Sequence, residues 1–470
     1  MSDSADAEGL TTKEFGGAFK RFLDQAVSSA PQEEAFFTGL LRRHLGTDPL
    51  RLPVVSEQFE AHDHGNVQVA LDAYLAQPAR SAEIVGVKAF HKHMMGTTLS
   101  DLLTPPGPMG GGPTQGPVEY LNLSLEGDRK LNCIQFGLVL VTEERESYAV
   151  LVRGPHDLRM EPLRVEVMAP SREAANRLLD ELRRSISERN IYRGHVLSLS
   201  ANRFGALEVH YHPLPEVDHD SIILPPGVLE RVERHTLGFA RHRHRLARAG
   251  RHLKRGILLH GAPGTGKTLT AMYLASAMTE RTVLLLTGRT FGLIKQSCAL
   301  ARMLAPSMVV LEDVDLVAEE RTGEGACTPL LFELLNEMDG LAEDVDVIFL
   351  LTTNRPDLLE PALAARPGRV DQAIEIPLPD EDSRRRLLQL YGEGLDLRIE
   401  DASAIVKRTE GTSGAFIREL LRKAALYAAE EGNGMVVYDR HISDSLHDLL
   451  VHGGELTKRL LGVQVPPRGR

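Results

Sequence analysis

The stretch Gly261-Ala-Pro-Gly-Thr-Gly-Lys-Thr268 decides the fold, and it follows the pattern G-x-x-x-x-G-K-[ST]. The apolar run Arg255–His260 precedes it and predicts a buried strand. The residues after it, Leu269–Met278, carry apolar side chains at helical spacing. A strand, a glycine-rich loop and a helix in this order present backbone N–H groups and a positive helix end to phosphate groups. The sequence therefore predicts a site for a nucleoside triphosphate.

The expected cofactors of this loop, called the P-loop below, are ATP and Mg²⁺. The ammonium group of Lys267 can reach the β- and γ-phosphates, and the hydroxyl of Thr268 can bind Mg²⁺. The predicted nucleotide-binding residues are the loop and the residue after it: Gly261, Ala262, Pro263, Gly264, Thr265, Gly266, Lys267, Thr268 and Leu269.

Two adjacent acids follow a second apolar run. Residues 307–311 predict a strand, and Glu312 and Asp313 come directly after it. A phosphate-binding fold needs one acid to hold Mg²⁺ and another to polarise the attacking water. We assign the metal role to Glu312, together with Thr268, and the base role to Asp313. The alternative, a solvated acidic strand end, is disfavoured because the strand follows a P-loop at a suitable distance.

A third apolar run, residues 345–353, ends at Asn354. The Asn354 amide can donate a hydrogen bond to the attacking water or to the γ-phosphate. Alternatively, this side chain caps the turn formed by residues 354–357. Two arginines, Arg366 and Arg369, follow on a short turn. In isolation such arginines are usually surface charges, but here they come after a complete nucleotide site.

Charge and composition exclude several classes of protein. The 470-residue chain has a net charge of −11, which argues against a nucleic-acid partner or an acidic membrane surface. No apolar run reaches the roughly 18–20 residues needed to span a bilayer, and the N-terminus is acidic and polar, unlike a signal peptide. Only three widely spaced cysteines are present. These features predict a cytoplasmic protein without a disulfide framework.

Over residues 220–445 the chain resembles the AAA family of ATPases. The residues that carry the resemblance are Gly261–Thr268, Glu312-Asp313, 333–340 (Glu-Leu-Leu-Asn-Glu-Met-Asp-Gly), 352–354 (Thr-Thr-Asn), 366–371 (Arg-Pro-Gly-Arg-Val-Asp) and 376–380 (Ile-Pro-Leu-Pro-Asp). Several independent motifs in the family's order make this resemblance highly specific.

The resemblance implies a fold and roles for further residues. It implies an α/β fold, a P-loop AAA core with a parallel sheet flanked by helices and a helical lid, preceded here by an α+β N-terminal region. Asn354 matches the residue called sensor 1, and Arg366 and Arg369 match arginine fingers that enter the neighbouring subunit's site. Gly414 and Ala415 match a lid motif near the adenosine. A homo-oligomeric ring, usually a hexamer, follows from this likeness.

Three departures from the family pattern stand out. The usual Asp-Glu pair is reversed to Glu312-Asp313, as in the subgroup that contains the mitochondrial translocase of the Rieske protein, although no membrane anchor is seen. The base is therefore one methylene shorter. Tyr391 replaces a ribose-contacting His, and packing is an equally good role for it. The segment Gly288–Pro306, where the family's pore loop normally lies, is short. In it Phe291, followed by a glycine, is either a pore residue or a buried core residue.

The sequence divides into an expected series of regions. We expect a mainly helical region (1–103), a Pro/Gly-rich linker or loop (104–117), an α+β domain (118–217), the large ATPase subdomain (218–380), a helical lid (381–452) and a disordered tail (453–470).

The leading functional hypothesis is an ATP-hydrolysing protein that remodels a protein client or complex, with residues 1–217 binding the client or an adaptor. A nucleotide-gated assembly switch with little turnover is the alternative, motivated by the reversed acids and a short pore segment. A nucleic-acid motor is disfavoured by the net charge. The ending Arg468-Gly-Arg470 lacks the hydrophobic-Tyr-x pattern by which AAA proteasome activators dock, so we expect a different role.

Overall fold

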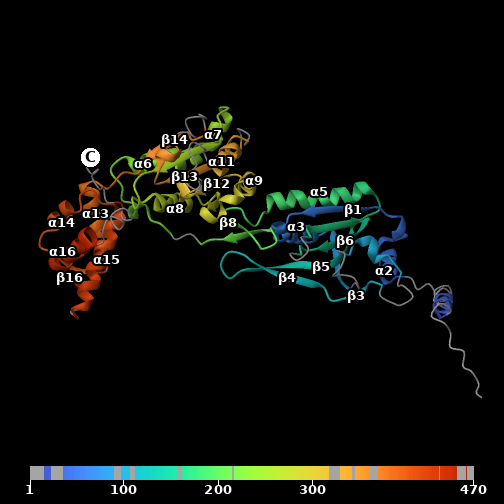
Figure 1. The fold of residues 1–470 in the computed structure, drawn as a ribbon. Coiled ribbons are helices and arrows are strands. Elements are labelled where there is room, and N and C mark those ends of the chain that lie inside the picture. Colours follow the sequence, from blue (N-terminus) through green and yellow to red (C-terminus); the bar gives the residue numbers. More distant parts are fainter. Residues whose placement is uncertain are drawn as a thin grey trace, which may run out of the picture. The chain divides into compact units, whose positions relative to one another are not determined.

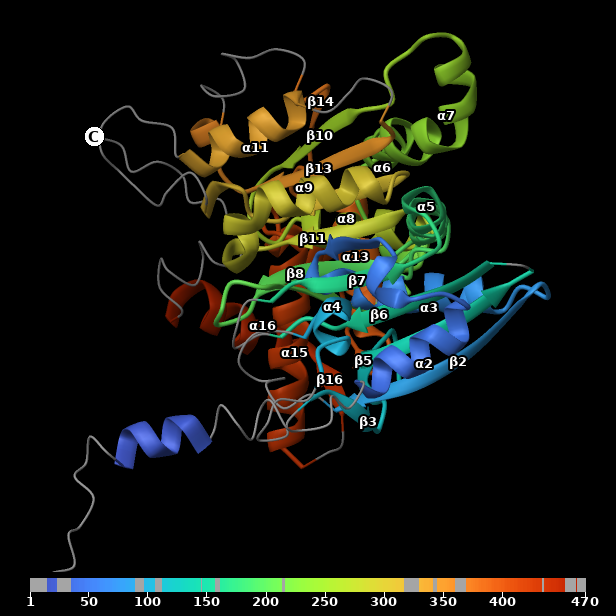
Figure 2. The same cartoon turned by 90° about the vertical axis from the view of Figure 1, so that its right-hand side faces the viewer.

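The structure is a computed structural model, and it divides into two compact units. It describes residues 15–22, 35–88, 97–105, 112–144, 146–156, 161–213, 216–316, 329–340, 345–359, 369–432, 435–452 and Gly462. The first unit comprises Met1–Ile191 and Asn202–Leu207, and the second comprises Tyr192–Ala201 and Glu208–Arg470. Figures 1 and 2 show the helices and strands of each unit, and each unit is described below by itself.

The first unit is built on an antiparallel sheet. Among the described residues this sheet has seven strands in the order β1-β7-β6-β5-β2-β3, with β4 paired to β5. The strands are β1 (Val54–Phe59), β2 (Arg80–Lys88), β3 (Thr114–Gly116), β4 (Glu119–Ser124), β5 (Lys130–Glu143), β6 (Glu146–Arg153) and β7 (Leu163–Met168). The helices are α2 (Phe36–Leu45), α3 (His64–Leu75), α4 (Leu99–Leu102) and α5 (Arg172–Glu188).

Both faces of this sheet are covered by helices, because its central strands are apolar on both sides. Val139 and Val150 pack in one buried cluster with side chains from α3 and α5. Leu138 and Leu151 pack in a second cluster with side chains from α2 and α4. The first unit therefore has two apolar layers, one on each side of a single sheet.

The sheet crosses the division that the sequence had indicated at residues 104–117. Strand β2, from before this segment, pairs with β5, from after it, and β1 pairs likewise with β7. Strand pairing between distant segments leaves no mark on either segment alone. The sequence therefore could not show that strands on both sides of this Pro/Gly-rich linker or loop belong to one sheet. Residues 106–111 of that stretch lie outside the described ranges.

The second unit has the predicted parallel sheet. Its strands are ordered β14-β10-β13-β12-β11-β8-β9 within the described ranges. β10 pairs in parallel with β13 and β14, and β12 pairs in parallel with β11 and β13. The strands are β8 (Val196–Ala201), β9 (Leu207–Tyr211), β10 (Arg255–His260), β11 (Thr282–Leu286), β12 (Ser307–Leu311), β13 (Val347–Thr353) and β14 (Gln372–Glu375).

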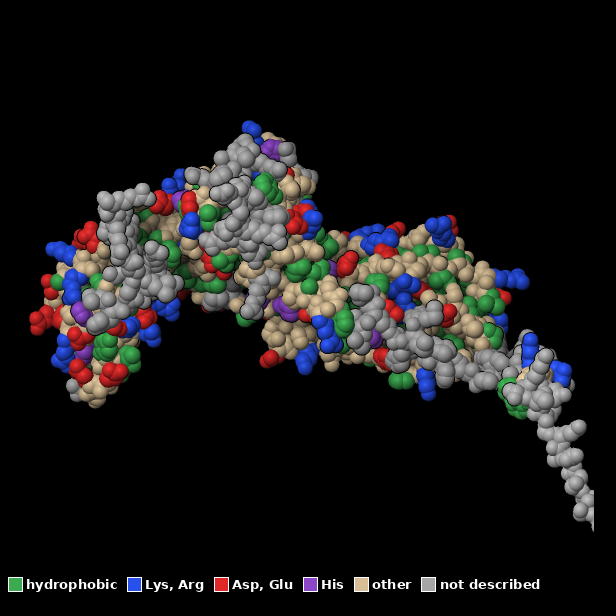
Figure 3. Space-filling view, viewed as in Figure 1, with side chains coloured by type: hydrophobic (Ala, Val, Ile, Leu, Met, Phe, Trp, Pro, Cys, Tyr) green, Lys and Arg blue, Asp and Glu red, His purple; other side chains and the backbone are tan. Residues whose placement is uncertain are grey.

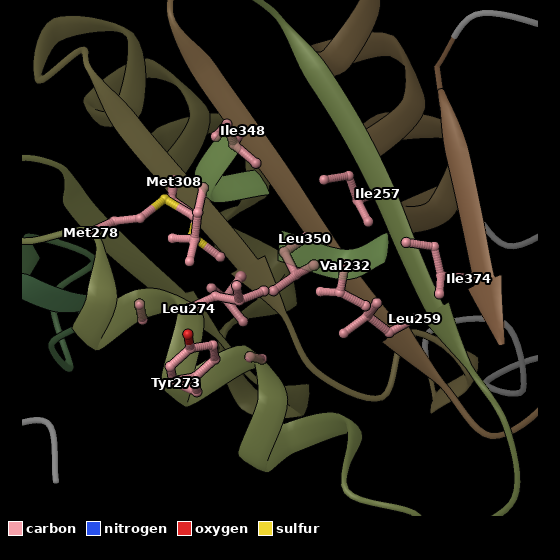
Figure 4. Packing of buried hydrophobic residues seen from close by; sticks show 14 of the residues in the cluster. Val232, Ile257, Leu259, Tyr273, Leu274, Met278, Met308, Ile348, Leu350 and Ile374 are labelled. Atoms are coloured by element: carbon pink, nitrogen blue, oxygen red, sulfur yellow. The ribbon is translucent and has the colours of Figure 1, made fainter. Parts of the chain in front are cut away.

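Helices pack against this sheet through residues that alternate along its strands. Ile348 and Leu350 lie in one cluster with Leu274 of α8 and Val232 of α6 (Figure 4). The intervening Phe349 is fully buried, and alternation directs it to the opposite face. The helices are α6 (Val228–Glu233), α7 (Phe239–Arg248), α8 (Lys267–Ala277), α9 (Ile294–Met303) and α11 (Pro329–Asp339).

A mainly helical lid follows the sheet, as predicted. It has its own apolar core, in which Phe416 and Leu420 are fully buried. Its elements are α13 (Glu381–Gly392), β15 (Asp396–Arg398), α14 (Ala402–Arg408), α15 (Gly414–Glu430), β16 (Val436–Tyr438) and α16 (Asp439–His447). Figure 3 shows acidic and basic side chains interspersed on the visible face of this lid.

Among the helices in the described part of the chain, none has the length and apolar character needed to cross a bilayer.

Candidate functional site

The P-loop connects the end of β10 to the start of α8. Its glycines adopt backbone angles that other residues avoid: φ is +152° at Gly261, +75° at Gly264 and +103° at Gly266. A Cβ atom at Gly261 would lie 2.2 Å from the carbonyl oxygen of Ile376. The loop can follow this path only because glycine occupies these positions, and it places the N-terminus of α8 beside it.

Lys267, the first residue of α8, is buried with its ammonium group on the P-loop. Its Nζ donates hydrogen bonds to the carbonyl oxygens of Gly261 (3.0 Å) and Ala262 (2.9 Å). Burial lowers the pKa of Lys267 to about 8, although the negative charges of Asp313 and Asp315 oppose this shift. A cation in this position can transfer its hydrogen bonds from the loop to a phosphate oxygen.

Glu312 lies where β12 ends, within hydrogen-bond reach of the loop. Burial raises the pKa of Glu312, the charge of Asp313 raises it further, and a hydrogen bond from the Thr268 hydroxyl lowers it. The two residues predicted to hold Mg²⁺ are therefore in contact. A hydroxyl and a carboxylate are hard oxygen ligands of the kind that Mg²⁺ prefers, so the residues fit this ion.

Asp313 has an unusual backbone conformation, with φ at +51°. Its N–H group donates to the hydroxyl of Thr352 across 3.0 Å. Burial raises the pKa of Asp313, and so does Asp315, whereas Lys267 and Asn354 lower it. Asp and Asn tolerate a left-handed backbone better than most residues because of their short polar side chains. This gives a local reason for an aspartate at this position.

Asn354 follows β13, and its amide group is turned toward the acidic pair. The Nδ2 atom of Asn354 donates to Oδ1 of Asp313 across 3.2 Å. The carboxyl ends of the parallel strands β10, β12 and β13 meet at one edge of the sheet, where ligands of α/β folds bind. The P-loop, the acidic pair and Asn354 are brought together at this edge.

The lid contacts the P-loop directly. The N–H group of Ala415 donates to the carbonyl oxygen of Gly264 across 3.1 Å. A Cβ atom at Gly264 would lie 2.7 Å from both the Cβ of Ala415 and the Oγ of Ser413. Gly414, the first residue of α15, also approaches this loop. The two lid residues predicted to bind nucleotide thus lie beside the loop.

A pocket opens next to the P-loop, and sequence reasoning missed most of its lining. Tyr391 packs against the core of the lid, which agrees with the packing role considered for it, and it also lines this pocket. Burial raises the pKa of Tyr391. The pocket is lined by Ser221, Ile222, Ile223, Leu224, Pro225, Gly264, Thr265, Gly266, Leu269, Pro377, Pro379, Leu387, Tyr391 and Gly414. Residues 221–225 match no motif, and no sequence signal could have identified them.

Sequence reasoning also missed three residues that bond the two strand ends together. The hydroxyl of Thr352 accepts from Asp313, and Asp315 accepts from Thr353 and Asn354. Two features of the sequence could have identified them. Thr352 and Thr353 are polar residues at the end of an apolar strand, and Asp315 is a third acid shortly after the acidic pair.

The remaining predicted residues lie elsewhere or outside the described ranges. Arg366 lies in the undescribed segment 360–368. Arg369 is only 4% exposed and forms an ion pair with Asp339 of its own chain. Phe291 is 3% exposed, which agrees with a packing role and not with a pore residue.

Comparison with known proteins identifies a related domain. Residues 257–378 match the family described as "ATPase family associated with various cellular activities (AAA)". The chain is 36% identical over 199 residues to the 26S proteasome regulatory subunit S10B homolog B of Arabidopsis thaliana, covering 39% of this chain and 50% of that protein. It is 35% identical over 192 residues to the proteasome-activating nucleotidase of Methanothermobacter thermautotrophicus, covering 38% and 46%.

The chain spans about half the length of the relatives it matches. The chain contains an AAA ATPase domain with homology to proteasome regulatory subunits, and the first unit lies wholly outside residues 257–378, which match the family.

Proposed function

We propose that the chain binds ATP with Mg²⁺, hydrolyses it, and uses the turnover to remodel a protein client or complex as a ring oligomer. The observation that carries this proposal is the convergence of Lys267, Asp313 and Asn354 at the carboxyl edge of the parallel sheet. The Asn354–Asp313 hydrogen bond and the influence of Lys267 on the pKa of Asp313 both support it.

Each residue has a defined task in this proposal. Lys267 neutralises the β- and γ-phosphates, and Asp313 accepts a proton from the attacking water. Asn354 orients that water or the γ-phosphate through the same amide that contacts Asp313. Thr268 and Glu312 would hold Mg²⁺, which supplies positive charge to the phosphate oxygens when bound.

The nucleoside part of ATP would occupy the pocket beside the P-loop. Its lining includes the apolar side chains of Ile222 and Leu224 and the ring of Tyr391, which suit a flat base and a ribose. Gly414 and Ala415 would close it from the lid. The backbone of the P-loop and Leu269, which also lines the pocket, complete the proposed cofactor site.

We assign Arg366 and Arg369 as arginine fingers of a hexameric ring, as the family resemblance implies. Homology to proteasome regulatory subunits supports a ring. The ion pair between Arg369 and Asp339 gives Arg369 a partner within its own subunit, so Arg366 is the stronger candidate for contact with a neighbour.

The first unit would select the client or an adaptor, since it lies outside the family match and has an independent core. We also propose a cytoplasmic setting, because Cys133 and Cys298 are free, buried thiols. The order Glu312–Asp313 supports a relation to the subgroup of the Rieske-protein translocase.

A nucleotide-gated switch with little turnover is the second candidate. The short side chain of Asp313 favours it, since the carboxylate already accepts a hydrogen bond from Asn354 and has less reach than glutamate.

Steady-state ATP hydrolysis separates the two functions. Purified full-length protein with Mg²⁺ should release phosphate continuously, and the rate should fall at least 100-fold in Asp313→Asn. A single stoichiometric burst followed by stable nucleotide-bound protein would support the switch. The remodelling role is then tested by capturing proteins on the Asp313→Asn variant in the presence of ATP, with the Lys267→Ala variant as the control. A client should be retained by Asp313→Asn, which is expected to bind ATP, and not by Lys267→Ala, which is not.

A further inference from the structure

We propose that Asp315 is a positioning residue for ATP hydrolysis, which fixes Asn354 against Asp313. This inference rests on the proposed function, because it concerns the geometry of the same reaction. Asp315 does not belong to the acidic pair that holds the metal and activates water. Its side chain is 7% exposed, so its carboxylate sits inside the protein.

The buried carboxylate of Asp315 binds the end of the neighbouring strand. Its Oδ1 atom accepts a hydrogen bond from the hydroxyl of Thr353 at 2.8 Å and another from the backbone N–H of Asn354 at 3.2 Å. Burying a carboxylate is unfavourable unless hydrogen bonds or charges compensate it. Asp315 therefore has a strong preference for the one position in which both donors reach it.

These bonds belong to a hydrogen-bond network that connects the ends of β12 and β13. The backbone of Asp313 donates to the Thr352 hydroxyl, and the side chain of Asn354 donates to Asp313. The residue after Asp313 adds a further bond, from the N–H of Val314 to the carbonyl oxygen of Thr352. Asp315 adds the bond that fixes the Asn354 backbone itself, from which the amide side chain extends.

The position of that amide has consequences for the reaction. A displacement of about 1 Å in a positioned group can reduce a rate by roughly 100-fold. Without Asp315, the Asn354 backbone loses the acceptor that holds its N–H group, and Asp313 and Lys267 lose a nearby negative charge. The hydrogen bonds from Lys267 to the P-loop remain. The loss should therefore fall on kcat and not on ATP affinity.

Three variants of the wild-type chain test the assignment. Asp315→Ala removes both acceptor bonds and should lower kcat about 10- to 100-fold, with KM for ATP changed less than threefold. Asp315→Asn keeps an acceptor oxygen of the same shape but loses the charge that acts on Asp313 and Lys267. It should recover part of the lost rate, because the hydrogen bonds and not the charge fix Asn354. Thr353→Val removes the hydroxyl donor with little change in volume, and it should lower kcat less than Asp315→Ala does.

A double variant distinguishes positioning from independent action. If Asp315 acts through Asn354, then Asp315→Ala combined with Asn354→Ala should be no slower than Asn354→Ala alone. Multiplication of the two rate losses would overturn the inference. If Asp315→Ala does not fold, the combinations of Asp315→Asn and Thr353→Val with Asn354→Ala give the same test.

A carboxylate at the other end of β13, the strand whose end Asp315 binds, provides the matched control. Asp346, directly before β13, forms an ion pair with Arg281 at 2.6 Å and is 12% exposed in its side chain. Asp346→Asn should lower Tm but leave kcat unchanged. A kcat loss in Asp346→Asn as large as that in Asp315→Ala would show a general effect of strand stability and overturn the inference.

Different results would contradict the proposed function and the role of Asp315. If wild-type protein shows no ATP turnover, the hydrolysis proposal itself is wrong. If wild-type protein turns over and Asp313→Asn does not, while Asp315→Ala keeps the wild-type kcat, only the role of Asp315 is wrong.

Discussion

The amide nitrogen of Asn354 lies 3.2 Å from a carboxylate oxygen of Asp313, to which it donates a hydrogen bond. The two residues follow different strands, β12 and β13, and they meet because these strands are parallel neighbours. The proposed base and its proposed partner therefore share a hydrogen bond that the protein itself provides. The attacking water must then be positioned by a pair of groups that already share a hydrogen bond.

Replacement of Lys267 by alanine should abolish tight ATP binding. The change removes the buried cation that would face the phosphates, so we expect affinity to fall about 100-fold or more, as measured by titration calorimetry with MgATP. Lys295→Ala is the matched control, since that lysine is 66% exposed and lies on α9. Undiminished affinity in Lys267→Ala would contradict the site assignment.

Substitutions of Glu312 and Asp313 should have different effects on ATP binding and turnover. Glu312→Gln should weaken ATP binding in the presence of Mg²⁺ but have little effect with EDTA, because it removes the proposed charged ligand of the ion. Asp313→Asn should retain MgATP and lose turnover, because the amide cannot accept the proton of the water. Binding and phosphate release, measured on the same preparations, check both. Normal hydrolysis by Asp313→Asn would exclude Asp313 as the base.

Mixing two inactive variants should restore activity if Arg366 completes a neighbour's site. Arg366→Ala keeps its own Lys267 and Asp313, whereas Lys267→Ala keeps its own Arg366. Some interfaces of a mixed ring then combine an intact finger with an intact P-loop. ATPase activity per subunit should also rise with protein concentration. Concentration-independent activity in a protein that sediments as a monomer with ATP would contradict the ring.

Arg369→Ala should destabilise the subunit itself. The guanidinium group is buried and pairs with Asp339, so its removal leaves that carboxylate without its partner. Because the side chain of Asp339 is 48% exposed and water can replace its partner, we expect the free energy of unfolding to fall by about 0.5–1.5 kcal/mol, measured by urea titration without nucleotide. An unchanged stability, together with lost turnover, would instead favour a role of Arg369 at the subunit interface.

The first unit should lose stability in mild acid because of His64. Burial lowers the pKa of His64 below 6.5, although its bond to the carbonyl oxygen of Ile134 opposes the shift. The unfolded chain therefore takes up a proton at this residue near pH 6.5 while the folded chain does not. Stability is fully present above that pH and falls as the pH drops below it.

Hydrogen exchange of β5 amides between pH 7 and pH 5, corrected for the intrinsic rate, measures this effect. His64→Gln retains a donor but cannot titrate, so its protection should vary less with pH. His242→Gln, at an exposed position on α7, is the control and should behave like the wild type. Equal pH dependence in all three proteins would contradict the prediction.

The sequence predicted the parts of the site that are contiguous in the chain. The P-loop, Glu312 and Asp313, and Asn354 each follow a strand that local apolar patterns reveal. Asp315 and Leu224 were missed because their importance arises from the packing of distant segments. The pairing of β2 with β5 was missed for the same reason, since the two strands are separated by a Pro/Gly-rich segment.

The hydrogen bond from Ala415 to Gly264 makes the lid and the phosphate-binding loop thermodynamically linked. If a phosphate group shifts the loop, the first turn of α15 must follow or the bond must break. Linkage is reciprocal, so a partner that binds one position of the lid would change the affinity of the proposed nucleotide site by the same factor by which nucleotide changes the affinity of that partner. In the proposed ring, a neighbour that contacts the lid would therefore alter the affinity of the proposed nucleotide site.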